Sequence, residues 1–366
     1  MTTVKQILDR LCDIAPMHLA ESWDNPGLQC GDSNAPVHGV LIALDCTMAV
    51  IEEAKKRGCD LIVTHHPMLF RGVKQVTDKS LEGRKLLELL KNGMSVISMH
   101  TNLDIAQDGV NDWLARALEL EDLELLEETG RRSWKKIETY VPRPQAEQVA
   151  KAMTDAGAGA LGNYQCCTFR GQGEGTFFPM AGSAPYMGQI GRLERVEEVK
   201  IETSAPADVM PQVVKALLAA HPYEMPAYYI TDTDTPAQPY GLGRVGMLPH
   251  PMSQQEFLYH VKEKLHAEGL RYCGERQSIQ RVAVGGGACG EFADLAFACG
   301  ADAYVTADLK YHDFVDGAEK GYFLIDAGHF ETENMICERL RQVVAEGSGE
   351  IPVLMSEIHR DAVHFA

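Results

Sequence analysis

The sequence predicts an α/β protein in which two related halves form one body, interrupted by a ferredoxin-like insert. Short apolar segments alternate with helical patterns near both ends of the chain, which is typical of parallel strands connected by helices. Segments of the first half recur in the second half, and an independent repeat occupies the middle. A chain of 366 residues has room for two or three domains of roughly 100–200 residues each.

Three apolar segments near the N-terminus have counterparts, in the same order, near the C-terminus. We interpret each as a strand followed by a helix, and we place the two halves of the body at 1–129 and 236–366. The matching pairs are GVLIALD (39–45) with RVAVGGG (281–287), GCDLIVTHH (58–66) with GADAYVTAD (300–308), and GMSVISMHTNLD (93–104) with GYFLIDAGHFETE (321–333).

The middle of the chain contains a second repeat. KIETYVP at 136–142 matches KIETSAP at 200–206, and the same offset aligns 148–152 with 212–216. Each copy is predicted to form a strand, a helix and a strand, and the first copy adds a strand pair through YQCCTFRG and GEGTFFPMAG. Two such copies give the βαββαβ order of a ferredoxin-like module, which we place at 130–235.

Charge and composition exclude several classes of protein. The net charge of -18 and the pI of about 5.1 would repel phosphate backbones, so general nucleic-acid binding is not expected, although a basic pocket for one small phosphorylated ligand stays open. No segment reaches the ~18 apolar residues of a membrane span, and the N-terminus is predicted to be an amphipathic helix rather than a signal peptide. Ten cysteines without a CxxC motif indicate a reduced, cytoplasmic protein.

Histidines and carboxylates follow the predicted strands at their carboxyl ends, where ligands of open α/β sheets gather. His65 and His66 close the apolar run LIVT. Adjacent side chains on a regular strand point apart, so this pair alone is either structural or a source of ligands for two neighbouring ions.

Two further clusters favour the metal site. His100 and Asp104 follow the apolar run SVISM, and His329 lies four residues before Glu333 at a predicted strand-to-helix junction. Residues four apart share one face of a helix, and imidazole with carboxylate suits a divalent cation. Three such clusters at equivalent strand ends predict a metal centre.

Six stretches spread along the chain carry a family resemblance: AESWDNPGLQCGD, LIVTHHPMLFRG, SVISMHTNLDIAQDGVND, HPYEMPAYYI, GADAYVTADLKYHD and DAGHFETE. In these stretches the chain resembles the Nif-three-like family, also called GTP cyclohydrolase I type 2 homologues. The resemblance implies a dinuclear metal centre, a toroidal homohexamer and Asp104 as the bridging ligand. By motif position, the implied ligands are His65, His66, Asp104, His329 and Glu333.

Two motifs depart from the family pattern. The usual T-G-D-I-K-Y-H-D is TADLKYHD at 306–313, and the common C-G-G-S-G is GGGAC at 285–289. The altered residues leave the fine shape of the pocket open. The glycine run at 285–290 either receives a phosphate on its backbone N–H groups or forms a tight turn. HPYEMPAYY, within the insert, is interpreted as a packing motif.

Further candidates surround the predicted metal centre. His100 and His312 are candidate proton carriers, because imidazole titrates near physiological pH. Trp23, Asp308 and Lys310 are candidate substrate-binding residues. The competing interpretation gives each of them a structural role, and the segment 23–25 can equally border the pocket or cap a turn.

Two functions compete. The first is a metal-dependent hydrolase of the GTP cyclohydrolase-like type, in which two divalent ions per chain activate water toward a small-molecule substrate. The second is a non-catalytic metal-binding protein that serves regulation, metal handling or interaction. The predicted ligands accept Zn, Fe, Mn or Ni, so the sequence does not select the metal.

Overall fold

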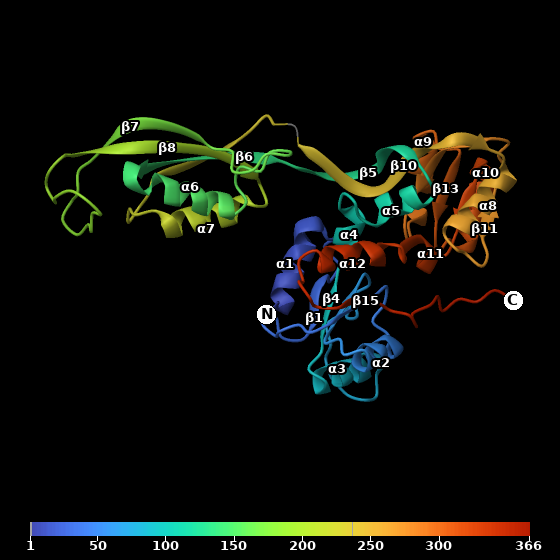
Figure 1. The fold of residues 1–366 in the computed structure, drawn as a ribbon. Coiled ribbons are helices and arrows are strands. Elements are labelled where there is room, and N and C mark those ends of the chain that lie inside the picture. Colours follow the sequence, from blue (N-terminus) through green and yellow to red (C-terminus); the bar gives the residue numbers. More distant parts are fainter. Residues whose placement is uncertain (1, 236) are drawn as a thin grey trace. The chain divides into compact units, whose positions relative to one another are not determined.

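The computed structural model describes residues 2–235 and 237–366. The chain divides into two compact units (Figure 1). Unit 1 combines 1–129 with 240–366, and unit 2 comprises 130–239. Unit 1 contains two mixed sheets with helices on both faces, which confirms the predicted α/β class, and unit 2 contains one antiparallel sheet.

The first sheet of unit 1 has the order β1-β4-β3-β2-β15. Its strands are β1 (Gly27–Cys30), β2 (Val40–Ala43), β3 (Leu61–Thr64), β4 (Ser95–Ser98) and β15 (Val353–Met355). The strands β15, β2, β3 and β4 are parallel, whereas β1 pairs with β4 in the antiparallel direction. All residues of β2, β3 and β4 are buried, as expected for parallel strands covered on both faces.

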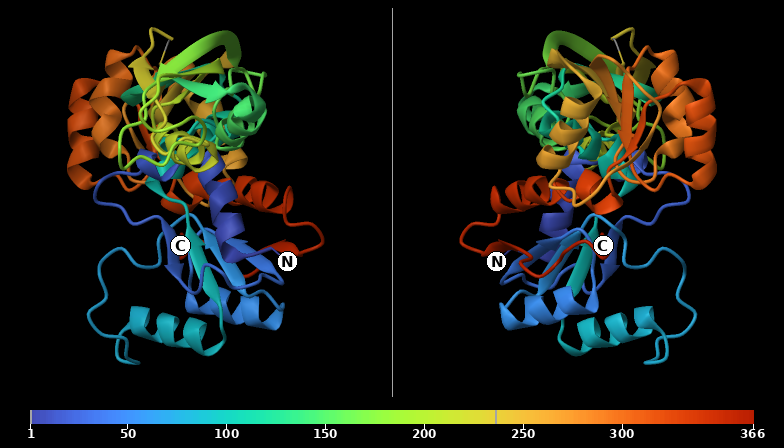
Figure 2. Two further views of the ribbon diagram at one scale, coloured as in Figure 1. Left: turned by 90° about the vertical axis from the view of Figure 1, so that its left-hand side faces the viewer. Right: turned by 90° about the vertical axis from the view of Figure 1, so that its right-hand side faces the viewer.

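Helices cover both faces of this sheet (Figures 1 and 2). Val40 and Ile42 pack with α1 (Val4–Ile14) and α12 (Ile336–Ala345) on one face. Their neighbours Leu41 and Ala43 face α2 (Met48–Lys56) and α3 (Leu81–Lys91), because alternate side chains of a strand point to opposite faces.

The second sheet of unit 1 has the order β11-β14-β13-β12-β10-β5. Its three parallel strands β12, β13 and β14 follow one another in the chain as β2, β3 and β4 do, and antiparallel neighbours flank them. Its members are β5 (Glu121–Arg132), β10 (Gln238–Met252), β11 (Arg271–Cys273), β12 (Ile279–Val284), β13 (Ala303–Thr306) and β14 (Leu324–Asp326).

This sheet also lies between two helical layers. The helices α5 (Val110–Ala117) and α8 (Gln254–Lys264) pack on one face, and α9 (Ala293–Ala298) and α10 (Tyr311–Lys320) pack on the other.

Among residues 2–235 and 237–366, no helix combines the length and apolar character that crossing a membrane requires. The short elements are η1 (Met17–Leu19), α4 (Thr101–Ile105), η2 (Arg143–Gln145), η3 (Gly290–Phe292) and α11 (His329–Glu333).

Unit 2 contains a four-stranded antiparallel sheet in the order β7-β8-β6-β9. Two helices, α6 and α7, pack against one face of it. The predicted strand pair in YQCCTFRG and GEGTFFPMAG is a single strand, β7, because its whole length pairs with β8. The bounds are β6 (Trp134–Pro142), α6 (Ala146–Asp155), β7 (Phe169–Phe177), β8 (Glu194–Pro206), α7 (Met210–Ala220) and β9 (Tyr228–Asp232).

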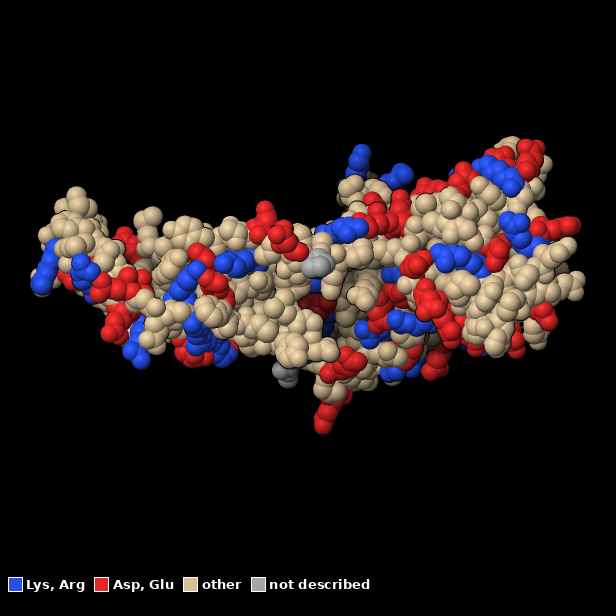
Figure 3. All heavy atoms as spheres, turned by 90° about the horizontal axis from the view of Figure 1, so that it is seen from above, with Lys and Arg blue, Asp and Glu red and all other residues tan. Residues whose placement is uncertain are grey.

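Charged side chains of both signs are interspersed on the face shown in Figure 3. On this face, the described residues form no continuous basic band of the kind that would track a nucleic-acid backbone. This distribution agrees with the acidic net charge of the chain.

Candidate metal centre

Three chain segments of unit 1 bring histidines and carboxylates to one point. His65 and His66 directly follow β3, and Asp104 lies in α4, which starts shortly after the neighbouring strand β4. His329 and Glu333 begin and end α11, which follows β14 of the second sheet. The first two segments meet because parallel strands end at the same edge of a sheet.

These side chains form groups that can hold a metal ion. His66, His329 and Glu333 make one group, His65, Asp104 and Glu333 make a second, and His65, His66 and His100 make a third. In the first, Glu333 Oε2 lies 2.8 Å from His66 Nε2 and 3.1 Å from His329 Nε2. In the second, His65 Nε2 lies 3.5 Å from Asp104 Oδ1 and 3.7 Å from Glu333 Oε2. Glu333 therefore belongs to the first and the second group.

All four histidines around this point are held in the same way, with Nδ1 hydrogen-bonded to an oxygen and Nε2 left for the centre. An acceptor at Nδ1 fixes the ring orientation and makes the Nε2 lone pair available, as in histidines that bind metals. The Nδ1 partners are the Met99 carbonyl for His65 (2.7 Å), Asp45 for His66 (2.8 Å), Asp308 for His329 (2.8 Å) and Asp24 for His100 (2.8 Å).

Two buried polar atoms at this point are left unsatisfied. Neither His65 Nε2 nor Asp104 Oδ1 has a hydrogen-bond partner among residues 2–235 and 237–366. Burying such atoms without a partner costs free energy, so native structures almost always supply one. A cation between the two atoms would satisfy both, and the residues present therefore fit a metal ion.

The electrostatics of the cluster also favour a cation. Burial and the nearby charge of Glu333 raise the pKa of Asp104 well above its ordinary value. Burial lowers the pKa of His65 to about 3, so this imidazole is neutral. Although burial opposes it, hydrogen bonds to Asp45 and Glu333 raise the pKa of His66 to about 10. A divalent cation would replace the proton of His66 and offset both carboxylates.

The glycine run after β12 shapes the centre from another side. Gly287 has a φ of +63°, and a Cβ atom there would lie 2.1 Å from Glu333 Oε1. The Gly287 carbonyl accepts hydrogen bonds from the Thr306 hydroxyl (3.1 Å) and the Ala307 N–H (3.0 Å), which fix the turn. The run is thus held against the end of β13 and leaves room for the carboxylate of Glu333.

A cavity of about 800 Å³ opens onto the centre. Trp23, His100, Asp104, His329 and Glu333 are among the residues that line it. The exposed ring of Trp23 stacks on Phe70 with centroids 5.9 Å apart. Two of the predicted ligands do not line the cavity. His65 is buried and His66 is half-buried.

The remaining candidates occupy different positions. Asp308 does not line the cavity, but its Oδ2 atom lies 2.8 Å from Nδ1 of His329. Asp308 therefore supports the orientation of the His329 ring. Lys310 and His312 are exposed at the start of α10, outside the residues that line the cavity.

Two supporting residues were not among the candidates chosen from the sequence. Asp45 ends the apolar segment 39–45, and the strand-end rule that selected His65 could have selected it too. Asp45 Oδ2 also lies 3.2 Å from Nε2 of His359, in the C-terminal segment. The local sequence does not identify His359 as a site residue. Its contact with Asp45 depends on the long-range pairing of β15 with β2.

Comparisons with known proteins show the family of the chain. A family model described as Duf34/NIF3 (NGG1p interacting factor 3) matches residues 2–362. The chain belongs to this family. The match confirms the resemblance carried by the sequence motifs.

Several known proteins resemble the chain over most of its length. A Bacillus subtilis protein named GTP cyclohydrolase 1 type 2 homolog is 41% identical over 333 residues, covering 90% of this chain and 89% of its own. A Halalkalibacterium halodurans protein of the same name is 37% identical, covering 99% and 98%. A crystal structure of a Bacillus cereus protein related to NIF3 has a TM-score of 0.84 at 38% identity, covering 100% of this chain and 99% of that chain.

Proposed function

We propose that the chain is a metal-dependent hydrolase with two divalent ions per chain. His65, His66, Asp104, His329 and Glu333 are the proposed ligands. The observation that carries the proposal is the convergence of anchored imidazoles on the carboxylates of Asp104 and Glu333, with His65 Nε2 and Asp104 Oδ1 unsatisfied among the described residues. The mixed donor set admits Zn, Fe, Mn or Ni.

We assign the two groups that contain Glu333 to the two proposed ions. Glu333 is common to both groups, so its carboxylate is placed to serve both ions. Asp104 belongs to the group with His65, and its role as a bridge stays a prediction from the family resemblance. Glu333 is buried and the side chain of Asp104 is only 15% exposed, and a cation offsets the cost of desolvating their charges.

The cavity beside the centre favours catalysis over simple storage. When bound, such ions lower the pKa of a water molecule and polarise the group that it attacks. His100 lines the cavity, and its Nδ1 is held by Asp24, which also accepts hydrogen bonds from the N–H and hydroxyl of Thr101. A ring fixed in this way is suited to move a proton at Nε2.

The outer wall of the cavity narrows the substrate class. It carries Glu21, Glu127, Glu291 and Asp294, and no Lys or Arg lines it within residues 2–235 and 237–366. Burial and the charges of Glu291 and Glu21 raise the pKa of Glu127. The wall would repel the several negative charges of a nucleoside triphosphate. We therefore propose neutral or cationic cyclic amides or heterocycles as substrates. GTP is included as a candidate only because the names of the relatives contain it.

A substrate panel with two variants tests this function. Metal-loaded protein is assayed on cyclic amides, neutral and cationic heterocycles, phosphoesters and GTP. His100→Asn should lower kcat by about 10²–10⁴-fold with unchanged metal content, whereas His312→Asn, on the exposed start of α10, should leave both unchanged. Equal losses in the two variants, or no loss in His100→Asn, would contradict the proposed proton carrier.

The alternative is a non-catalytic metal-binding protein in regulation, metal handling or interaction. The specific observation in its favour is that two of the proposed ligands are buried, with His65 0% and Glu333 4% exposed. Protein that retains its ions but turns over no member of the panel would favour this alternative.

The family resemblance and the topology support further proposals about organisation. We propose that unit 2 is a ferredoxin-like module inserted between two related halves, at about residues 130–235. Its strand order β7-β8-β6-β9, with one helix after β6 and one after β8, supports this. From the resemblance we also propose a cytoplasmic homohexamer, and the ten free cysteines agree with a reducing compartment.

A further inference from the structure

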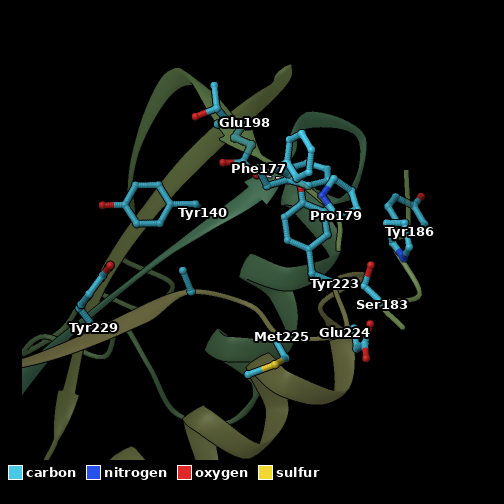
Figure 4. Close-up of a pocket in the computed structure, with 15 residues that line it drawn as sticks. Tyr140, Phe177, Pro179, Ser183, Tyr186, Glu198, Tyr223, Glu224, Met225 and Tyr229 are labelled. Atoms are coloured by element: carbon cyan, nitrogen blue, oxygen red, sulfur yellow. Dashed lines mark hydrogen bonds between the residues drawn. The ribbon is translucent and has the colours of Figure 1, made fainter. Parts of the chain in front are cut away.

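Unit 2 contains a cavity of its own, of about 550 Å³, formed entirely by residues between 140 and 229 (Figure 4). It lies on the face of the sheet opposite α6 and α7, because Tyr140 and Glu198 alternate with the core residues Val141 and Val199. The segment after β7, which includes Pro179 and Tyr186, lines it from another side. Its volume is typical of small-molecule sites.

The sequence of β7 leaves space for this cavity. Gly171, Gly173 and Gly175 alternate along the strand, so this face of the strand carries no side chain at three successive positions. Gly173 pairs with Glu198 across the sheet. A Cβ atom at Gly175 would lie 2.1 Å from Glu198 Oε2, so the glycine is what allows the carboxylate to lie there.

Aromatic rings form most of the walls. Tyr223 lies 6.0 Å from Phe177 and 6.5 Å from Tyr186 between ring centroids, and Tyr140 meets Tyr229 edge to face at 6.4 Å. Figure 4 shows Tyr140 and Tyr229 on one side of the view and Phe177, Tyr223 and Tyr186 on the other. Tyr186 and Tyr229 are about half exposed, which is unusual for rings that serve only packing.

The charge in this cavity is negative and uncompensated. The Tyr223 hydroxyl donates a 2.7 Å hydrogen bond to Glu198 Oε1. Glu224 also lines the cavity, and no Lys, Arg or His does so within residues 2–235 and 237–366. In that same part of the chain, Glu198 forms no ion pair with Lys or Arg.

The nearest lysines of this sheet face are already engaged. Lys200 lies 3.0 Å from Glu138 and also pairs with Glu202, and Lys136 lies 3.3 Å from Glu138. Each of these lysines pairs with carboxylates other than Glu198. The carboxylate of Glu198 is therefore left as the charged group of an aromatic pocket.

We propose that this cavity is a binding site for a small organic cation, of the alkylammonium or quaternary ammonium class. Aromatic faces attract such cations through their quadrupole, and a partly desolvated carboxylate adds a direct charge interaction. The residues Tyr223, Glu224, Met225 and Tyr229 come from the HPYEMPAYY segment, so this segment forms a wall of the site as well as packing. The site is separate from the proposed metal centre in residues and chemistry.

Choline is the probe for this proposal, with its neutral carbon isostere 3,3-dimethylbutan-1-ol as the matched ligand. Both are titrated into the full-length protein, and binding is followed by ligand-detected NMR on their methyl signals. We expect choline to bind at least about tenfold more tightly than the isostere, because only choline gains the cation–π and carboxylate interactions. This comparison needs no variant, so it stands even if a substitution impairs folding.

Two variants locate the site. Glu198→Gln keeps the size of the side chain and an acceptor for Tyr223 but removes the charge, and it should weaken choline binding by about tenfold. Glu197→Gln removes the same charge from the adjacent position of β8, on the other face, where Glu197 is 81% exposed, and should not change binding. The proposal would be overturned by equal affinities for choline and the isostere, or by equal effects of the two variants. Absence of choline binding because a second copy covers the face would overturn it as well.

Discussion

Asp104→Asn should release at least one metal ion and lower the melting temperature of the metal-loaded protein. The substitution keeps the size and one acceptor atom, but it removes the charge that offsets a dication beside His65. An ion present at a hundredfold excess over its Kd stabilises the folded state by about 2.7 kcal/mol, and this contribution should disappear. Elemental analysis and melting curves with and without chelator measure both effects.

The metal-free proteins and a second variant provide the controls. Without metal, Asp104→Asn should be neutral or mildly stabilising, because it removes a negative charge near Glu333. Glu333→Gln should release both ions, since Glu333 belongs to both ligand groups. Equal metal content and equal melting temperatures for Asp104→Asn and the parent would reject Asp104 as a ligand. Loss of both ions in Asp104→Asn would instead support Asp104 as the bridge.

Gly287→Ala should weaken metal binding without replacing any ligand. Its Cβ atom would lie 2.1 Å from Glu333 Oε1 and 3.3 Å from His329 Cε1, so the carboxylate must leave its position. We expect the metal affinity to fall by about 10–100-fold, as for other changes that disturb the orientation of ligands. The left-handed backbone at Gly287 adds about 1–2 kcal/mol of destabilisation when alanine replaces glycine.

Gly300→Ala is the matched control for backbone strain. Gly300 has a φ of +81°, and a Cβ atom there would have no neighbouring atom within 4 Å, so alanine introduces the strain without a steric clash. Both variants should lose similar stability without metal, and only Gly287→Ala should lose metal affinity. A loss of affinity in both variants, or in neither, would show that the space beside Glu333 does not control the centre.

Much of the fold could be predicted because its signals are local. The short, largely apolar runs 40–43, 61–64 and 95–98 are fully buried parallel strands, as expected for strands covered on both faces. The clusters at strand ends could be found for the same reason, since His65 directly follows β3 and Asp104 lies in α4, shortly after β4. The sequence could not predict the antiparallel edge strands, such as β1, because their pairing depends on partners distant in the chain.

The details of the site that escaped prediction depend on long-range contacts. His359 reaches Asp45 across 314 positions of the chain, and Asp24 reaches His100 across 76. Neither the periodicity nor the spacing of residues in the sequence predicts such contacts. Lys310 and His312 were selected by their position in a motif, and their exposure on α10 follows from the way that helix packs on the second sheet.

The most direct test of the metal centre is the number of ions per chain. Protein purified without chelator and then reconstituted is analysed for metals and for protein concentration on the same sample. Two ligand groups that share Glu333 predict about two divalent ions per chain, and clearly more than one. Less than about half an equivalent after reconstitution would contradict the dinuclear centre.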